Sequence, residues 1–267
     1  MNRAFPFFIE TSSLQALLLR EFRAALLNRY FQVFAALSLL GGVMAIFFSE
    51  NADAIAFFVV QVALFLVSLF AVLAGVSSAQ AEREEWQFMF SQPVPRAAYV
   101  IGKFIAYSAI FAGVLALLFL PALFSGATIQ RVAILYFQTL LLAAAFLGLG
   151  LAAGFLAHDR AQALVIGATA WLLLLFGVDL IGLFAARLEF MQKIPDLWVS
   201  TLMLNPLDAF RIHALFALEQ IPAEAANKTP LANWWITHAG LWFSAVAALW
   251  SVSLIALAGF HLNKFEE

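Results

Sequence analysis

The stretch VAILYFQTLLLAAAFLGLGLAAGFLA, residues 132–157, decides the fold because it contains no charged side chain. A helix needs about 20 consecutive, mostly apolar residues to cross the hydrocarbon core of a bilayer. Five more runs meet this requirement with few or no charges, at 31–48, 54–80, 104–124, 161–186 and 236–262. The sequence therefore predicts an all-α integral membrane protein with six transmembrane helices.

The composition of the 267-residue chain agrees with a lipid environment. Hydrophobic residues make up 64% of it and charged residues 11%, and the mean hydropathy is +0.95. Soluble domains are about 45–50% apolar and about 25% charged, so this chain has too few ionisable side chains to form a polar shell. A net charge of -2 leaves no basic surface for a nucleic-acid backbone. The absence of cysteine excludes disulfides, thiol nucleophiles and thiolate metal sites.

The Lys and Arg residues predict which helix ends face the cytoplasm, because short cytoplasmic loops are enriched in them. With six spans, both termini lie on one side of the membrane. That side would hold Arg3, Arg20, Arg23, Arg29, Arg83, Arg96, Lys103, Arg160 and Lys264. The short opposite loops, 49–53 and 125–131, contain only Arg131. We therefore expect both termini to be cytoplasmic.

Two cytoplasmic segments are expected to form shorter helices. Residues 11–29 are rich in helix formers and predict an N-terminal helix at the membrane interface. Residues 81–98 are the most charged cytoplasmic stretch, and Pro93 and Pro95 predict a short helix followed by a sharp turn.

The segment between the fifth and sixth spans, residues 187–235, is too apolar for a loose linker. It contains four prolines and helical periodicity at 208–220. We expect a compact, helical periplasmic insertion within one domain that comprises residues 1–267.

The cytoplasmic segment between the second and third spans carries a candidate interaction surface. Its charged residues stand next to aromatic ones from which a solvated loop gains nothing. The residues concerned are Glu82, Arg83, Glu84, Glu85, Trp86 and Phe88. This pattern favours a helix on which another protein docks over a simple interfacial anchor.

Asp179 lies within the fifth span, where an ionisable side chain costs about 2.5 kcal/mol or more and normally faces protein or water. Two interpretations stay open: a functional group inside the membrane, or a residue near the outer interface that caps a helix or pairs with Arg187. Gln138, in the fourth span, favours an interhelical hydrogen bond. Gly150 and Gly154 have the spacing of small residues that lets two helices approach closely.

Motifs for catalysis or ATP binding do not emerge from the sequence. Gly102 and Lys103 lack the upstream glycine and the following hydroxyl of a phosphate-binding loop, so we expect no ATP hydrolysis and no cofactor in this chain. Met191, Met203 and His213 are of the types that bind Cu(I), but methionines at helical spacing more often fill the core. We therefore expect no metal site, with these three residues as weak candidates.

The order of these features resembles the permease subunits of ABC exporters. The residues that carry the resemblance are Arg20, Glu21, Asn28 and Arg29, followed after the acidic segment by Pro93, Arg96, Gly102 and Lys103. The resemblance implies a multi-pass protein of the bacterial inner membrane, two copies of which pair with two ATPase subunits that bind ATP and Mg. It also implies that the acidic segment is the coupling helix that rests on the ATPase.

The stretch LNPLDAFRI, residues 204–212, is similar to the permeases of the nitrous oxide reductase maturation system. This similarity implies a periplasmic copper-delivery partner, contacted by Asn205, Pro206, Asp208 and Arg211, and a role in assembling the copper centres of that reductase. The spans offer no Cys and few Met, so we expect mechanical transmission, or export of a small sulfur species, rather than passage of copper. The alternatives are export of haem, lipid or a drug, and ion-coupled transport through Asp179.

Overall fold

The computed structural model describes residues 11–48, 52–81, 83, 96–124, 128–185, 187–193, 200–218 and 230–263. The principal elements in these ranges are all helices. They are α1 (Thr11–Leu26), α2 (Arg29–Phe48), α3 (Ala52–Val62), η1 (Ala63–Val67), α4 (Ser68–Ala81), α6 (Arg96–Phe124), α7 (Ile129–Leu156), α8 (Arg160–Leu172), η3 (Leu173–Gly177), α9 (Val178–Ala185), α10 (Glu189–Lys193), α12 (Pro206–Ala217) and α14 (Pro230–Asn263).

Six helical stretches are long and apolar enough to cross a membrane. They are Arg29–Phe47, Ala54–Ala81, Arg96–Phe124, Ile129–Leu156, Arg160–Ala185 and Thr237–Leu262. The second consists of α3, η1 and α4, and the fifth of α8, η3 and α9. The structure therefore confirms six long apolar helices as candidate spans. Their ends agree with the prediction within three residues, except that the third begins at Arg96, eight residues before the predicted start.

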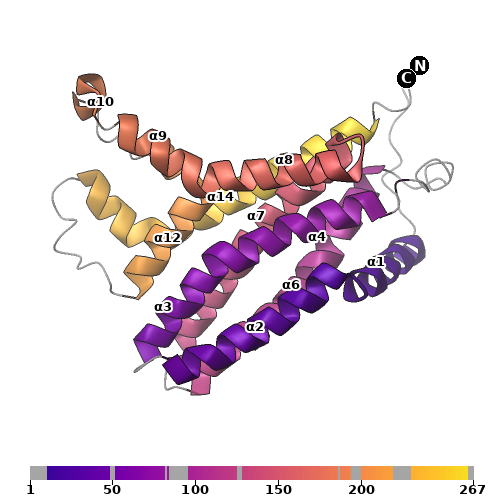
Figure 1. Ribbon diagram of the computed structural model, residues 1–267, viewed down its shortest axis with the longest axis horizontal. Coiled ribbons are helices and arrows are strands. Elements are labelled where there is room, and N and C mark those ends of the chain that lie inside the picture. Colours follow the sequence, from indigo (N-terminus) through magenta and orange to yellow (C-terminus); the bar gives the residue numbers. More distant parts are fainter. Residues whose placement is uncertain are drawn as a thin grey trace.

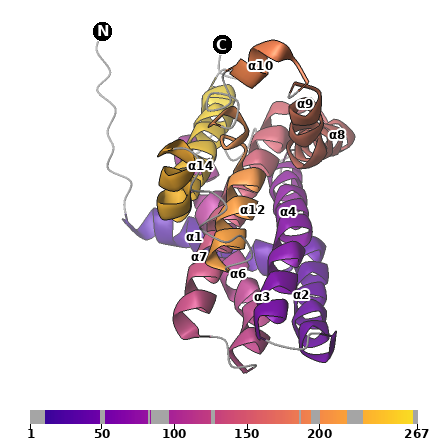
Figure 2. The same cartoon turned by 90° about the vertical axis from the view of Figure 1, so that its left-hand side faces the viewer.

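The long helices form a bundle whose two ends differ (Figure 1 and Figure 2). One end carries α1, the turn between α7 and α8 and the last turns of α14, and we call it the α1 end. The other end carries the junction between α2 and α3 and the start of α7, and α12 points toward it. We call this end the α12 end.

Helix α7 is the centre of the bundle, because 78% of its most apolar window is buried inside the protein. The close approach of α4 to α7 depends on glycine. A Cβ atom on Gly150 would lie 2.2 Å from the carbonyl oxygen of Val72, and one on Gly154 would lie 2.5 Å from the Cβ of Ala79. The predicted packing role of these two glycines is confirmed.

Helix α1 packs across the start of α6 and presents one narrow face to it. Glu21 and Ala25 are buried on this face, whereas Phe22 and Leu26 are exposed. Asn28 then ends α1 and begins α2, because its side-chain Oδ1 accepts a hydrogen bond from the backbone N–H of Tyr30 at 2.9 Å. The predicted N-terminal helix is present, and it ends three residues earlier than expected.

Part of the region predicted as an insertion between the fifth and sixth spans lies against the long helices. Helix α12 packs against α14 and α7, beside the spans. Helix α14 already begins at Pro230, inside the segment predicted as the insertion. Proline is favoured in the first turn of a helix, where its missing N–H needs no partner.

Candidate functional site

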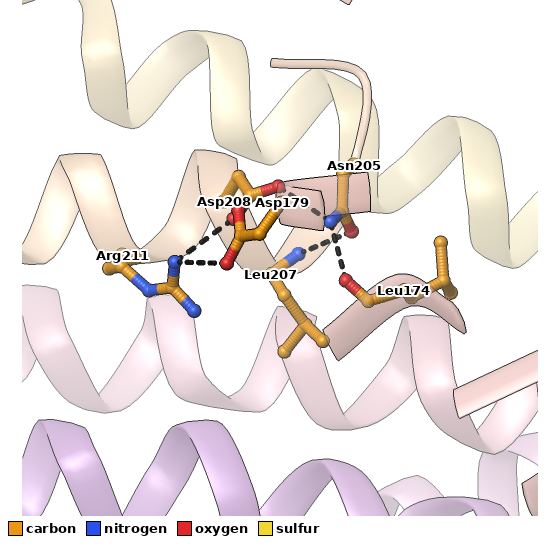
Figure 3. A network of polar contacts seen from close by, with 6 residues as sticks. All are labelled: Leu174, Asp179, Asn205, Leu207, Asp208 and Arg211. Carbon is orange, nitrogen blue, oxygen red and sulfur yellow. Dashed lines mark hydrogen bonds and ion pairs between the residues drawn. The ribbon is translucent and has the colours of Figure 1, made fainter. Parts of the chain in front are cut away.

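A cluster of polar side chains lies where α12 meets the fifth span (Figure 3). Asn205 precedes α12, and its Nδ2 donates to the carbonyl oxygen of Leu174 and to Oδ2 of Asp208, both at 2.7 Å. Its Oδ1 accepts from the backbone N–H of Leu207 at 3.2 Å. Asn205 therefore caps α12 and, through the same amide group, attaches it to the neighbouring span.

Arg211 completes the cluster one turn further along α12. Its Nη1 lies 3.1 Å from Oδ2 of Asp179 and 3.3 Å from Oδ1 of Asp208. One guanidinium is thus shared by two carboxylates from different helices. Burial, and then the nearby charge of Asp179, raise the pKa of Asp208 to about 6, although Arg211 and Asn205 act in the opposite direction.

The cluster is attached near the middle of the fifth candidate span. Leu174 is the 15th of the 26 residues of the fifth candidate span. On the other side, the indole N–H groups of Trp242 and Trp250 donate to the carbonyl oxygens of Met203 and Leu204, at 2.8 and 3.0 Å. The turn before α12 is therefore held between the middle of the fifth span and residues 242–250 of the sixth.

This depth is the main difference from the sequence-based expectation, which placed the stretch 204–212 in an external insertion. Asn205, Pro206 and Asp208 are buried within the chain, whereas Arg211 is partly exposed. Helix α12 has 12 residues, which is too short to span a bilayer. Contact of these residues with a periplasmic partner stays a prediction.

The attachment point on the fifth span is an irregular turn. Residues Leu173–Gly177 form the π-helical turn η3, in which Val178 N–H bonds to Leu173 O. Such a turn shifts the backbone hydrogen-bond register, and π-turns occur frequently at functional sites. The Leu174 carbonyl inside η3 is the one that accepts from Asn205.

A second π-helical turn, η1, lies in the second span and is connected to the first. Ser68 directly follows η1, and its hydroxyl donates to Leu64 O. The same hydroxyl accepts the indole N–H of Trp171, two residues before η3, at 2.9 Å. Sequence analysis did not single out either π-turn, because neither contains Pro or a polar residue that would mark it.

The predicted coupling surface falls mostly outside the described residues, which exclude Glu82, Glu84, Glu85, Trp86 and Phe88. Arg83 is described, and its guanidinium donates to Ala157 O. Gln80, three residues earlier, donates to Gly154 O at 2.5 Å. The chain leading into the coupling segment is thus attached to the end of α7 and to the turn before α8.

The partner of Asp179 is Arg211, 32 residues further along the chain, and not Arg187 as one of the two interpretations proposed. The Asp179 side chain is 48% exposed on the protein surface. Gln138 forms the expected interhelical contacts, since its Nε2 donates to Gly240 O at 3.4 Å and to Ser244 Oγ at 3.3 Å.

The structure describes the side chains of two of the three weak metal candidates, so the expectation of no metal site at these residues stays a prediction. Met203 lies in the turn before α12, His213 lines a cavity of about 660 Å³ at the α12 end, and the Met191 side chain is outside the described residues. Burial lowers the pKa of His213. Within the described ranges, no three His, Cys, Asp or Glu side chains gather as metal ligands would.

The comparisons with known proteins agree with a membrane permease. Residues 15–261 match the family described as ABC-2 family transporter protein, whereas no curated protein matches the sequence. Membrane subunits of this family have no ATPase activity, bind no cofactor themselves and pair with ABC ATPase subunits. The match covers nearly all of this multi-pass chain, which therefore belongs to the ABC-2 family of transporter proteins as a transmembrane permease.

Proposed function

We propose that this permease converts ATP hydrolysis by partner ATPase subunits into movement of α12 and the segment 187–235, and thereby acts on a protein in the periplasm. The observation that carries the proposal is the attachment of α12 to the fifth span. Asn205 bonds to Leu174 inside η3, and Arg211 bonds to Asp179 in α9. A tilt of this span would carry α12 with it.

The orientation needed for this mechanism follows from the positive charges. The α1 end holds Arg29, Arg83, Arg96 and Arg160 at helix termini, and an excess of Lys and Arg marks cytoplasmic ends. We place both termini and the coupling segment 82–90 in the cytoplasm. The α12 end then faces the periplasm.

A continuous series of contacts joins the coupling segment to α12. Arg83 and Gln80 attach the end of α4 to the α7–α8 turn, and α8 leads from this turn directly into η3. Because packed helices move as rigid bodies between discrete arrangements, force applied at 82–90 would reach η3 without a separate relay. Two permeases and two ATPases would form the working complex.

The more specific proposal is that the complex serves maturation of nitrous oxide reductase, with a copper-delivery protein as the periplasmic partner. Its support is the stretch 204–212, which supplies Asn205, Asp208 and Arg211 to the cluster. The family match favours an ABC permease over ion-coupled transport through Asp179. The alternative functions are export of haem, lipid, a drug or a sulfur species, and a transport assay of the complex would distinguish among them.

The test is to reconstitute the permease with its co-purifying ATPase and to compare the wild type with Asn205→Ala and Arg211→Met. We expect both variants to hydrolyse ATP at close to the wild-type rate and to lose the downstream effect. For the specific proposal, that effect is copper incorporation into nitrous oxide reductase in cells. Arg131→Gln, which removes a cation outside both the cluster and the segment 187–235, is the matched control.

Variants that lose the downstream effect but still hydrolyse ATP would support the transmission of movement through α12. Wild-type output in both cluster variants would overturn it. Normal copper incorporation in cells that lack the permease would reject the nitrous oxide reductase role but leave transmission intact, and the cargo alternatives would then be tested in the same vesicles.

A further inference from the structure

A small polar cavity at the α1 end has no role in the proposed transmission. Its volume is about 240 Å³, and its walls come from α1, the start of α2, the end of α4, α6 and the start of α8. The lining includes Arg29, Lys103 and Arg160, the hydroxyl residues Ser77 and Ser78, and Asn28. No Asp or Glu side chain is among its described lining residues.

The charge of this cavity is positive. Lys103 is neutralised by Glu21, whose Oε2 lies 2.7 Å from its Nζ. Arg29 and Arg160 form no ion pair within the parts of the chain that the structure describes, and both are exposed. Arg29 is also the first residue of the 20-residue helix α2, so the positive end of this helix dipole adds to the two guanidinium charges. Arg160 begins α8, whose N-terminus is capped by the exposed carboxylate of Asp159.

The side chain of Ser78 is an independent indication that this cavity binds a polar group. Its side chain is 1% exposed and lines the cavity, yet its Oγ has no hydrogen-bond partner among the described residues. A buried hydroxyl without a partner is costly, and such groups in native structures are usually satisfied by a water or a ligand. A ligand oxygen in the cavity would provide that partner.

The position of the cavity indicates which class of ligand it binds. Arg29 and Arg160 begin two of the candidate spans, Arg29–Phe47 and Arg160–Ala185, so they lie at the depth where lipid headgroups meet the protein. Basic pockets between transmembrane helices bind phosphate-containing headgroups, especially on the cytoplasmic side. Guanidinium groups and helix N-termini are the usual partners of phosphate oxygens.

We propose that this cavity binds the phosphate group of an anionic phospholipid, held by Arg29 and Arg160 at the rim and by Ser78 inside. Because α1 forms one wall and α8 another, the bound headgroup would connect the interfacial helix to the fifth span. The proposal concerns the α1 end alone and does not depend on the function proposed for α12.

The full-length permease is purified in detergent and mixed with vesicles of phosphatidylcholine alone, or of phosphatidylcholine with phosphatidylglycerol. Retained lipid is measured by mass spectrometry, and thermal stability is measured in parallel. We expect phosphatidylglycerol, but not phosphatidylcholine, to be retained and to raise the melting temperature. Arg29→Gln and Arg160→Gln should each weaken retention roughly tenfold, whereas Arg187→Gln, at the α12 end, should have no effect.

Ser78→Ala separates ligand binding from folding. Because this hydroxyl has no partner among the described residues, its removal should leave the lipid-free melting temperature unchanged or slightly raised, and should still reduce retention of phosphatidylglycerol. In a final measurement, inorganic phosphate is added as a competitor. Displacement of the lipid by phosphate would assign the same site to a soluble phosphate group. Wild-type retention in the Arg29→Gln/Arg160→Gln double variant would overturn the proposal.

Discussion

Lys103 Nζ lies 2.7 Å from Glu21 Oε2, and the two side chains are 2% and 0% exposed. This ion pair joins α1 to α6 across 82 positions of sequence, and the Tyr99 ring lies 4.8 Å from the same Nζ. Helix α1 is thus held to the bundle by a buried charge pair in addition to apolar contacts.

Removal of one charge of this pair should destabilise the protein severely. Glu21→Ala or Lys103→Ala leaves the other charge buried without its partner, which typically costs about 3–5 kcal/mol. The apolar double variant Glu21→Leu/Lys103→Met should recover most of this loss, because it buries no charge. Melting temperatures of the purified variants test both statements, with the exposed Arg23→Gln on α1 as control. A single variant as stable as wild type would contradict the role assigned to the pair.

The close contact between α4 and α7 at Gly150 predicts that one added methyl group strongly lowers the stability of the protein. Gly150→Ala would place its Cβ 2.2 Å from Val72 O, so the helices must separate, at a cost of about 1–3 kcal/mol. Gly113 in α6 is the matched control, since a Cβ there meets nothing within 4 Å. Gly113→Ala should be neutral or slightly stabilising, because alanine is the better helix former. Equal melting temperatures for the two variants would show that α4 and α7 do not pack this closely.

The raised pKa of Asp208 predicts a pH dependence of stability. At pH values between 3.8, the ordinary carboxyl pKa, and about 6, the raised pKa of Asp208, the folded protein keeps a proton on Asp208 that the unfolded chain has released. Because the folded state binds more protons in this window, its stability falls as the pH rises through it. Asp208→Asn should lack this contribution.

The pH prediction is checked by the difference in melting temperature between wild type and Asp208→Asn, measured from pH 4 to pH 7. We expect the wild type to lose stability relative to the variant as the pH increases. Asp159→Asn serves as control, because Asn also caps a helix well and Asp159 is an exposed cap on α8. A difference that stays constant or changes in the opposite direction would refute the assignment.

The spans were predictable because lipid imposes a simple requirement on the sequence. A long run without charge, such as 132–157, has few alternatives to a transmembrane helix. The interhelical contacts of Gln138 and the close approach at Gly150 followed from the same reasoning, since small and polar residues in spans usually face other helices.

The polar cluster could not be predicted, because its members are far apart in sequence and satisfy one another only in three dimensions. One of the two interpretations of Asp179 paired it with Arg187, eight residues away, whereas the fold brings Arg211 to it. The short helix α12 has polar residues that suit an external helix equally well. The contacts of Asn205 with Leu174, of Arg211 with Asp179 and of Trp242 with Met203 hold α12 against the spans, and these contacts appear only in three dimensions.

The two indole groups that hold the turn before α12 give the protein an intrinsic optical reporter. Trp242 and Trp250 are two of only seven tryptophans, and both donate to the backbone of this turn. Departure of the turn from the bundle would break both hydrogen bonds and change the polarity around the rings, so their fluorescence emission would shift. With no cysteine in the chain, a single engineered thiol on α12 would add a quencher or spin label at one known position, and the movement could be followed in real time.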